Sequence, residues 1–229
     1  AEGQARELAE VDPLTGCLNR RSIAPATDDL VTRANARGLA VAFLMIDLDN
    51  FKQINDVNGH TVGDIILREA AHRIAEALPD DSLLARFGGD EFAAVLSFDP
   101  RYPERVDSIA ASLIESVCRP IDAEGTSIET TISVGIATNI ECRTGASGAE
   151  MLHKADIAMY HAKKHGRNRA ARFDPAMENE LRLRSELAAA IRAGVPAGEF
   201  VPFYEKQVDL GSGDIVGFEM LARWNSETF

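Results

Sequence analysis

The feature that most restricts how this chain can fold is a pair of short apolar runs separated by four residues. Leu83–Phe87 and Phe92–Leu96 flank the segment Gly88-Gly-Asp-Glu91. Apolar runs of this length around a pair of glycines predict a β-hairpin, because glycine adopts the positive φ angles that tight turns need. The sequence therefore predicts an antiparallel strand pair that carries Asp90 and Glu91 at its tip.

Helical and strand patterns alternate on both sides of this hairpin. Helices are predicted at residues 1–10, 22–37, 62–77, 106–118 and 151–165, from the spacing of apolar residues and the flanking glycines and prolines. Further strands are predicted at 41–46, as a buried central strand, at 128–136, as a half-buried strand, and at 169–173, at a sheet edge. This order indicates an α+β fold, with a central, mainly antiparallel sheet flanked by helices.

The pattern changes after Asp174-Pro175. A helix is predicted over 178–193, closed by the segment Gly194-Val-Pro-Ala-Gly198, and strands at 200–208 and 215–221 follow it. A hairpin alone is only marginally stable in water. We therefore interpret the tail as the opening of a second domain that this sequence does not complete.

Composition excludes several classes of protein. The 36 acidic and 24 basic residues give a net charge of −12, which argues against a protein that coats nucleic acid. No run of 18 apolar residues and no signal peptide pattern occur, and Cys17, Cys118 and Cys142 are typical of free thiols in a reducing compartment. We expect a cytoplasmic domain without a membrane segment of its own, compatible with a membrane anchor upstream.

Carboxylates follow two of the predicted strand ends. Asp47 and Asp49 end the apolar run Val41–Ile46, and Asp90 and Glu91 lie at the hairpin tip. If the two elements are neighbours, the carboxylates converge at one edge of the sheet. Hard oxygen ligands in that number suit Mg²⁺ together with substrate phosphates, and therefore phosphoryl or nucleotidyl transfer. The alternative, an acid solvated at a turn, stays open for Asp49.

Other residues suit an anionic, nucleotide-like ligand. Gly88 and Gly89 let a ligand approach the backbone closely, and Lys52, Lys163 and Arg167 are candidate phosphate partners. Lys163 and Arg167 are four residues apart, on one face of a helix end, where cations also complement the helix dipole without any ligand.

An amide and a carboxylate are candidates for reading a guanine edge. These are Asn55 and Asp64. An alternative for Asp64 is a capping box with Thr61, and the two roles are compatible. The five histidines form no metal set with cysteine or acidic partners.

At this point the motifs resemble those of a known family. Gly88-Gly-Asp-Glu-Phe92 is the signature of GGDEF domains, and the chain resembles bacterial diguanylate cyclases over residues 12–173. The other motifs in family order are Asp12-Pro-Leu-Thr-Gly-Cys-Leu-Asn-Arg-Arg21 (with Cys17 where leucine is usual), Asp47-Leu-Asp-Asn-Phe-Lys-Gln-Ile-Asn-Asp56, Gly59-His-Thr-Val-Gly-Asp64, Ser133-Val-Gly-Ile136, and Ala155-Asp-Ile-Ala-Met-Tyr-His-Ala-Lys163 through Gly166-Arg-Asn168.

The resemblance implies an activity and a set of roles. The domain would condense two GTP molecules into cyclic di-GMP with release of pyrophosphate, on a fold that resembles the palm of adenylyl cyclases and polymerases. Two domains would have to meet face to face, each with one GTP. The implied metal ligands are Asp47, Asp90 and the Leu48 carbonyl, for Mg²⁺ (or Mn²⁺), and Glu91 would lie beside the reacting 3′-hydroxyl as a metal ligand or a base. The residues implied for the nucleotide are Asn55 and Asp64 for guanine, Lys52, Lys163 and Arg167 for the β- and γ-phosphates, and Gly88 and Gly89 beneath it.

One family motif is absent. Many members carry Arg-x-x-Asp five residues before the signature, as a product-binding site, whereas this chain has Pro79-Asp-Asp-Ser82 there. We therefore do not expect feedback inhibition through that site.

The tail resembles the start of an EAL phosphodiesterase domain. Glu199-Phe-Val-Pro-Phe-Tyr204 and Gly217-Phe-Glu-Met-Leu-Ala-Arg-Trp224 fit its opening strands, with Glu219 at the motif glutamate and Met220 in place of alanine. The expected organisation is then the end of a signalling helix (1–11), the GGDEF domain (12–173), a connector helix and linker (174–198) and an incomplete EAL domain (199–229).

Two functions are compatible with these motifs. The first is an active diguanylate cyclase, attached in the full protein to an upstream sensor and to the EAL domain. The second is a non-catalytic GTP-binding module that regulates the attached phosphodiesterase. A nucleic-acid polymerase palm is disfavoured by the net charge of −12.

Overall fold

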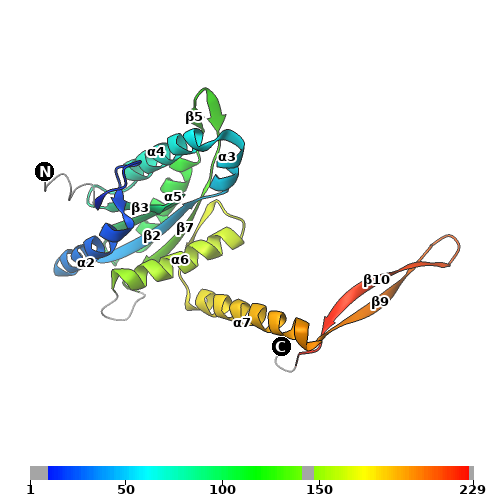
Figure 1. The fold of residues 1–229 in the computed structure, drawn as a ribbon. Coiled ribbons are helices and arrows are strands. Elements are labelled where there is room, and N and C mark those ends of the chain that lie inside the picture. Colours follow the sequence, from blue (N-terminus) through cyan, green and yellow to red (C-terminus); the bar gives the residue numbers. More distant parts are fainter. Residues whose placement is uncertain (1–9, 141–146, 227–229) are drawn as a thin grey trace. The chain divides into compact units, whose positions relative to one another are not determined.

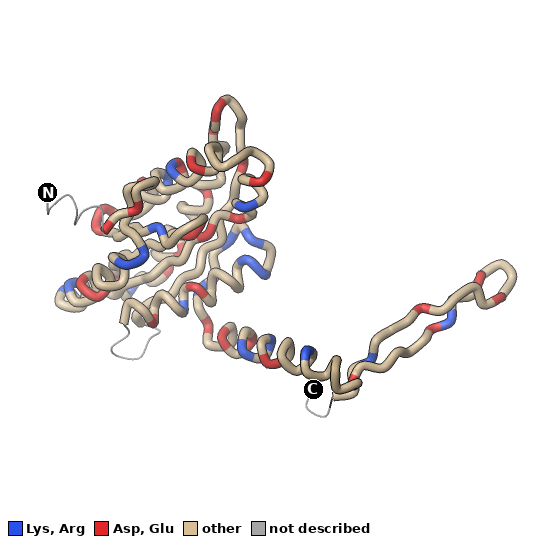
Figure 2. The backbone as a smooth tube through the Cα atoms, in the orientation of Figure 1, with Lys and Arg blue, Asp and Glu red and all other residues tan. Residues whose placement is uncertain are grey.

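The computed structural model of the chain describes residues 10–140 and 147–226 and divides into two units, Ala1–Met177 and Glu178–Phe229. Acidic side chains occur in both units (Figure 2). The helix expected at residues 1–10 lies outside the described residues except for its last position, and so does Cys142. Cys17 and Cys118 are free thiols. No helix in the described part of the chain combines the length and the apolar character that crossing a bilayer requires.

The first unit is built on a six-stranded sheet with strand order β1-β3-β4-β2-β7-β8 (Figure 1). The strands are β1 (Leu18–Asn19), β2 (Ala40–Leu48), β3 (Leu83–Gly88), β4 (Glu91–Phe98), β7 (Ile132–Thr138) and β8 (Arg169–Arg172). The interior pairs are antiparallel, and the edge pairs β1–β3 and β7–β8 are parallel. The expected hairpin and the mainly antiparallel α+β fold are both confirmed.

Helices cover both faces of this sheet. The bounds are α2 (Arg20–Ala36), α3 (Phe51–Asn58), α4 (His60–Ala77), α5 (Glu104–Val117) and α6 (Gly148–Lys164). Alternate residues of the buried strand β2 supply two separate cores. Leu44 and Ile46 pack with α4 and α5, whereas Phe43 and Met45 pack with α2 and α6.

Two local expectations are wrong. The polar segment after β2, for which no helix was predicted, forms the short helix α3. This helix begins directly after Asn50, whose backbone is left-handed (φ 59°). The single strand expected at 128–136 is divided: residues 126–128 belong to a small hairpin of β5 (Ile121–Ala123) and β6 (Thr126–Ile128), and β7 starts at Ile132.

The strand β7 is buried on both faces, although its alternating sequence predicts one polar face. Ser133 is buried because its hydroxyl donates a hydrogen bond to the Asp49 carboxylate at 2.7 Å. Gly135 is buried because α6 packs directly on it, so that a Cβ there would overlap the backbone of Ala155 and Met159. The small and polar positions of this strand therefore serve contacts with other elements instead of facing solvent.

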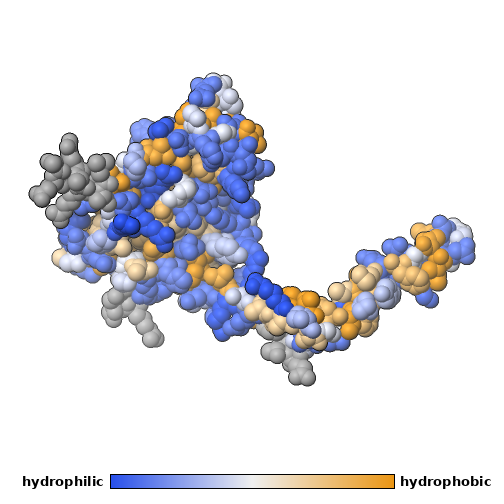
Figure 3. Space-filling model, viewed as in Figure 1, coloured by the Kyte–Doolittle hydropathy of each residue, from blue (hydrophilic) through white to orange (hydrophobic). Residues whose placement is uncertain are grey.

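The second unit contains most of helix α7 (Pro175–Ala197) and a hairpin of β9 (Phe200–Val208) and β10 (Ile215–Trp224). The helix continues past Gly194, where we expected it to end. Of the unit's described residues only Gly194 is buried, and hydrophobic side chains along the hairpin are exposed, including Phe203, Phe218 and Met220 (Figure 3). These described residues do not form a core of their own.

Candidate functional site

The C-terminal end of β2 and the turn between β3 and β4 lie side by side. Asp47 is the register partner of Glu91, and the backbone N–H of Leu48 donates to the Asp90 carbonyl oxygen at 3.2 Å. Residues directly opposite each other on antiparallel strands project from the same face. The carboxylates of Asp47 and Glu91 therefore share one face at this end of the sheet, with Asp90 at the adjoining turn.

The turn itself is open above its two glycines. Gly88 has a φ of 131° and Gly89 a φ of 56°, and a Cβ built on either residue would meet nothing within 4 Å. The positive φ angles explain why these positions favour glycine. The open space means that a ligand can lie directly on the backbone of this turn, as the sequence suggested.

Asp47 is paired with a lysine that is distant in the sequence. The Lys163 Nζ atom, in the last turn of α6, lies 2.6 Å from the Asp47 carboxylate, which is buried. Burial, with a smaller contribution from the neighbouring Asp90 and Glu91, raises the pKa of Asp47 to about 6 against the opposing effect of Lys163. The three carboxylates thus lie near enough to repel one another, and a cation among them would relieve this repulsion.

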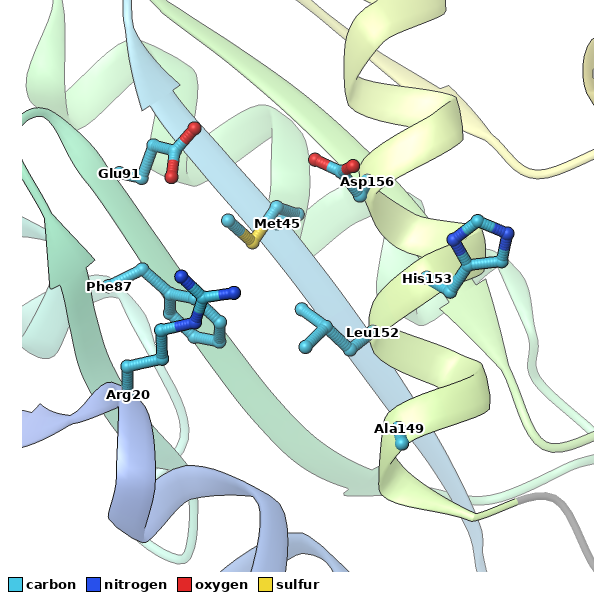
Figure 4. A pocket seen from close by; sticks show the side chains of 8 residues that line it. All are labelled: Arg20, Met45, Phe87, Glu91, Ala149, Leu152, His153 and Asp156. Carbon is cyan, nitrogen blue, oxygen red and sulfur yellow. The ribbon is translucent and has the colours of Figure 1, made fainter. Parts of the chain in front are cut away.

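Glu91 also borders a pocket of about 320 Å³ on the face covered by α2 and α6 (Figure 4). The apolar side chains of this pocket are Met45, Phe87, Ala149 and Leu152, and the polar ones are Arg20, Glu91, His153 and Asp156. Burial raises the pKa of Glu91, Asp156 and Asp90 raise it further, and Lys163 and Arg20 oppose them. A carboxylate with a raised pKa accepts protons more readily, as a general base must.

Asp49 is not a solvated turn acid. Its carboxylate accepts hydrogen bonds from the hydroxyls of Thr131 and Ser133, both at 2.7 Å, and from the backbone N–H of Asn168 at 3.1 Å. The side chain is 1% exposed. Asp49 therefore joins the end of β2 to the start of β7 and to the loop before β8, and its role here is structural.

Asn55 and Asp64 lie on the adjacent helices α3 and α4. The Asn55 Oδ1 atom is buried without a hydrogen-bond partner among the described residues. The alternative role of Asp64, in a capping box with Thr61, is wrong, because α4 begins at His60 with Gly59 at its N-cap and no side-chain cap. Asp64, which is half-buried, is thus not used as a cap.

Two of the candidate phosphate partners, Lys52 and Arg167, form no ion pair with Asp47, Asp90 or Glu91 in the described part of the chain. Lys52 is exposed in the first turn of α3, which starts three residues after Leu48. Arg167 follows α6, and its Nε atom is 4.0 Å from the Asp49 carboxylate, with the side chain 52% exposed. Both remain exposed cations near the end of β2, whereas Lys163 is already paired.

Sequence reasoning missed one residue that holds the turn. Arg86 donates to both carboxylate oxygens of Asp12 (3.1 and 3.3 Å) and, through two other nitrogens, to the Gly89 carbonyl oxygen (3.1 and 2.7 Å). Asp12 opens a motif that the sequence did present, but nothing in the spacing indicated its partner on β3. The arginine fixes the glycine turn against the start of the domain.

The donors at this site suit a hard divalent cation. The oxygen donors here are the carboxylates of Asp47 and Asp90 and the nearby backbone carbonyl of Leu48. In proteins, Mg²⁺ is commonly held by one or two carboxylates together with substrate phosphates. Within 10–140 and 147–226, no three His, Cys, Asp or Glu side chains are grouped to hold a metal by themselves. The donor set therefore fits a metal that arrives with a phosphorylated ligand.

Comparison with known proteins gives a consistent result. Residues 9–169 match the family model described as "Diguanylate cyclase, GGDEF domain". The chain is 35% identical over 228 residues to an uncharacterised signalling protein of Caulobacter vibrioides, covering 100% of this chain and 28% of that protein. It is 32% identical over 218 residues to the bifunctional diguanylate cyclase/cyclic di-GMP phosphodiesterase MucR of Pseudomonas aeruginosa, covering 95% of this chain and 31% of that protein.

A solved structure is also similar. It is a truncated form of TpbB (YfiN) from Pseudomonas aeruginosa that comprises only the GGDEF domain, with a TM-score of 0.70 and 34% identity over 75% of this chain and 99% of that one. The present chain spans less than a third of the length of the two curated relatives.

Proposed function

The chain belongs to the family of GGDEF diguanylate cyclase domains, and from this membership we propose that it condenses two GTP molecules into cyclic di-GMP with release of pyrophosphate. The observation that carries the proposal is the meeting of Asp47, Asp90 and Glu91 at an open glycine turn, opposite Lys163. In this reaction the 3′-hydroxyl of one nucleotide attacks the α-phosphate of the other.

We assign the acidic residues to metal binding and to proton transfer. Asp47, Asp90 and the Leu48 carbonyl would hold Mg²⁺, with Mn²⁺ as the alternative, and a bound divalent ion would neutralise phosphate charge and activate the attacking hydroxyl. Glu91 would accept the proton of that 3′-hydroxyl, a role that its raised pKa favours.

The base and the phosphates would be held by separate groups. Asn55 and Asp64 would read the guanine edge. The supporting observation is the buried Asn55 Oδ1, which has no hydrogen-bond partner in the part of the chain that the structure describes. Lys52, Lys163 and Arg167 would hold the β- and γ-phosphates, with Lys163 exchanging part of its contact with Asp47 for the nucleotide. Gly88 and Gly89 would lie beneath the nucleotide without side chains in its way.

We further propose the wider setting of this domain. Turnover would need two copies with their sites face to face, because each contributes one GTP. Residues 199–229 would open an EAL domain of a longer cytoplasmic protein with an upstream sensor, in line with matches to longer relatives that extend over the tail.

The decisive experiment incubates the 229-residue chain with GTP and Mg²⁺ and measures cyclic di-GMP by chromatography. Asp90→Ala should abolish product, whereas Asp29→Ala, which removes an exposed acid on α2, should not. Equal product from the unaltered chain and Asp90→Ala would refute the assigned site. GTP binding without product, even after dimerisation by a fused coiled coil, would instead support a regulatory GTP-binding module.

A further inference from the structure

The strongest unassigned feature near the site is the missing side chain of Gly63. This glycine lies in the first turns of α4, directly before Asp64, and it is buried. It is not among the residues with positive φ, so its backbone conformation does not require glycine. A reason for glycine at this position must therefore come from the space around it.

That space is occupied by Asn55. A Cβ on residue 63 would overlap Asn55 Oδ1, would lie 2.9 Å from Asn55 Cγ, and would lie 3.2 Å from Phe51 Cζ. Two of the three nearest atoms thus belong to one amide group. Because an asparagine side chain rotates more readily than a packed helix moves, an added methyl group would displace the amide first.

The amide that the methyl group would displace is also the one proposed to bind the base. Asn55 Oδ1 is buried and, among the described residues, has no hydrogen-bond partner. Burying a polar atom without a partner costs free energy, and the unpaired oxygen belongs to a side chain that is itself only half-buried, so this amide suits a ligand that pairs with it when bound. The Asn55 amide can occupy this position only because residue 63 has no Cβ.

We propose that Gly63 is a specificity-determining positioning residue, which keeps the Asn55 amide aimed at the base of the nucleotide. This inference rests on the proposed function, because it takes guanine as the ligand of Asn55. It goes further in assigning base selection to the contact between α3 and α4, and to a residue that touches no substrate. A side chain at position 63 should reduce the preference for guanine without removing the phosphate contacts.

The test measures binding of GTP and ATP in the presence of Mg²⁺ to the full chain, by competition with a fluorescent nucleotide. Gly63→Ala should weaken GTP binding at least about tenfold and leave ATP binding nearly unchanged, because ATP offers no guanine edge to lose. Gly38→Ala is the control for destabilisation: it places alanine at a glycine away from the site, where the positive φ, which Gly63 does not have, strains the backbone.

A double variant separates the amide from general packing. Asn55→Ala should lose the same preference. Asn55→Ala/Gly63→Ala should match Asn55→Ala in selectivity and lie close to it in melting temperature, because both amide atoms that the methyl group would overlap are gone and only the 3.2 Å contact with Phe51 Cζ remains. Additive losses in the double variant, or an unchanged GTP preference in Gly63→Ala, would overturn the inference. If the unaltered chain itself does not prefer GTP to ATP, the guanine assignment in the proposed function fails instead.

Discussion

The guanidinium of Arg86 lies 3.1 Å from the carboxylate of Asp12, and both side chains are largely shielded from solvent. The same guanidinium donates to the Gly89 carbonyl oxygen, so the pair connects the start of the domain to the glycine turn. A change in the position of Asp12 would therefore shift the backbone of the glycine turn, which lies beneath the proposed nucleotide site.

Asp12→Asn should destabilise the protein in a pH-dependent way. Burial alone would raise the pKa of Asp12, but hydrogen bonds from Thr15 and Arg86 outweigh it and hold the pKa below 3.8. The stabilisation is complete above the unfolded-state pKa and is lost as pH falls through the lower native pKa. We expect a loss of about 1–2 kcal/mol at pH 7 that shrinks towards pH 3, measured by urea unfolding. A loss that is equal at both pH values would contradict the ionic origin.

Lys163→Ala should lower turnover about a hundredfold, the size expected when one charged donor to developing phosphate charge is lost. It also leaves the buried Asp47 carboxylate without its partner at 2.6 Å. Lys164→Ala is the matched control, since its ammonium lies over the Tyr160 ring instead. Pyrophosphate release with GTP is the measurement, and equal rates for the two variants would remove Lys163 from the site.

Gly135→Ala should impair both stability and nucleotide binding. The added Cβ would overlap the backbone of Ala155 and Met159, so α6, which carries Lys163, must shift away from β7. Overpacking of this kind costs about 1–3 kcal/mol. Gly148→Ala, in the same helix, should be milder because its nearest contact is the Thr27 side chain at 3.1 Å. Thermal melts and GTP titrations of both variants test this ranking, and a reversed ranking would refute it.

Asp49→Ala should be the most destabilising change of a single acid in the first unit. It removes the acceptor of three hydrogen bonds and leaves the buried hydroxyl of Ser133 without this partner. We expect a loss of about 3–5 kcal/mol by urea unfolding, against less than about 0.5 kcal/mol for Asp80→Ala at an exposed turn. A small effect at position 49 would mean that the carboxylate acts on a ligand and not on the fold.

Sequence reasoning recovered what local pattern and motif order encode. The hairpin around Gly88 and Gly89 was predictable because turn chemistry and apolar runs are local signals, and the shared edge of Asp47 and Asp90 followed from strand ends. The role of Asp49 was not predictable, because its partners Thr131 and Ser133 lie directly before and within β7, more than 80 residues further along the chain. The same holds for β7, whose serine and glycine suggested a solvent face until their contacts were known.

The helix α3 was missed for a different reason. Its eight residues, from Phe51 to Asn58, bury only Phe51, so the apolar periodicity that reveals longer helices is absent. The roles of Gly63 and Arg86 were also invisible, since one acts through space left empty and the other through a partner far away in sequence. The motif resemblance named the ligand-binding candidates but not the residues that hold them in position.

The position of β2 at the centre of the sheet also sets an order of assembly. Its two neighbours, β4 and β7, come from distant parts of the chain, whereas β3 and β4 are joined by the glycine turn alone. Hairpins of that kind close within about 1–10 μs, while contacts between distant segments form slowly because a long loop must first be closed. The glycine turn can thus exist early in folding, but Asp47 meets Lys163 only after α6 has docked, so a partly folded chain would display the signature turn without a working site.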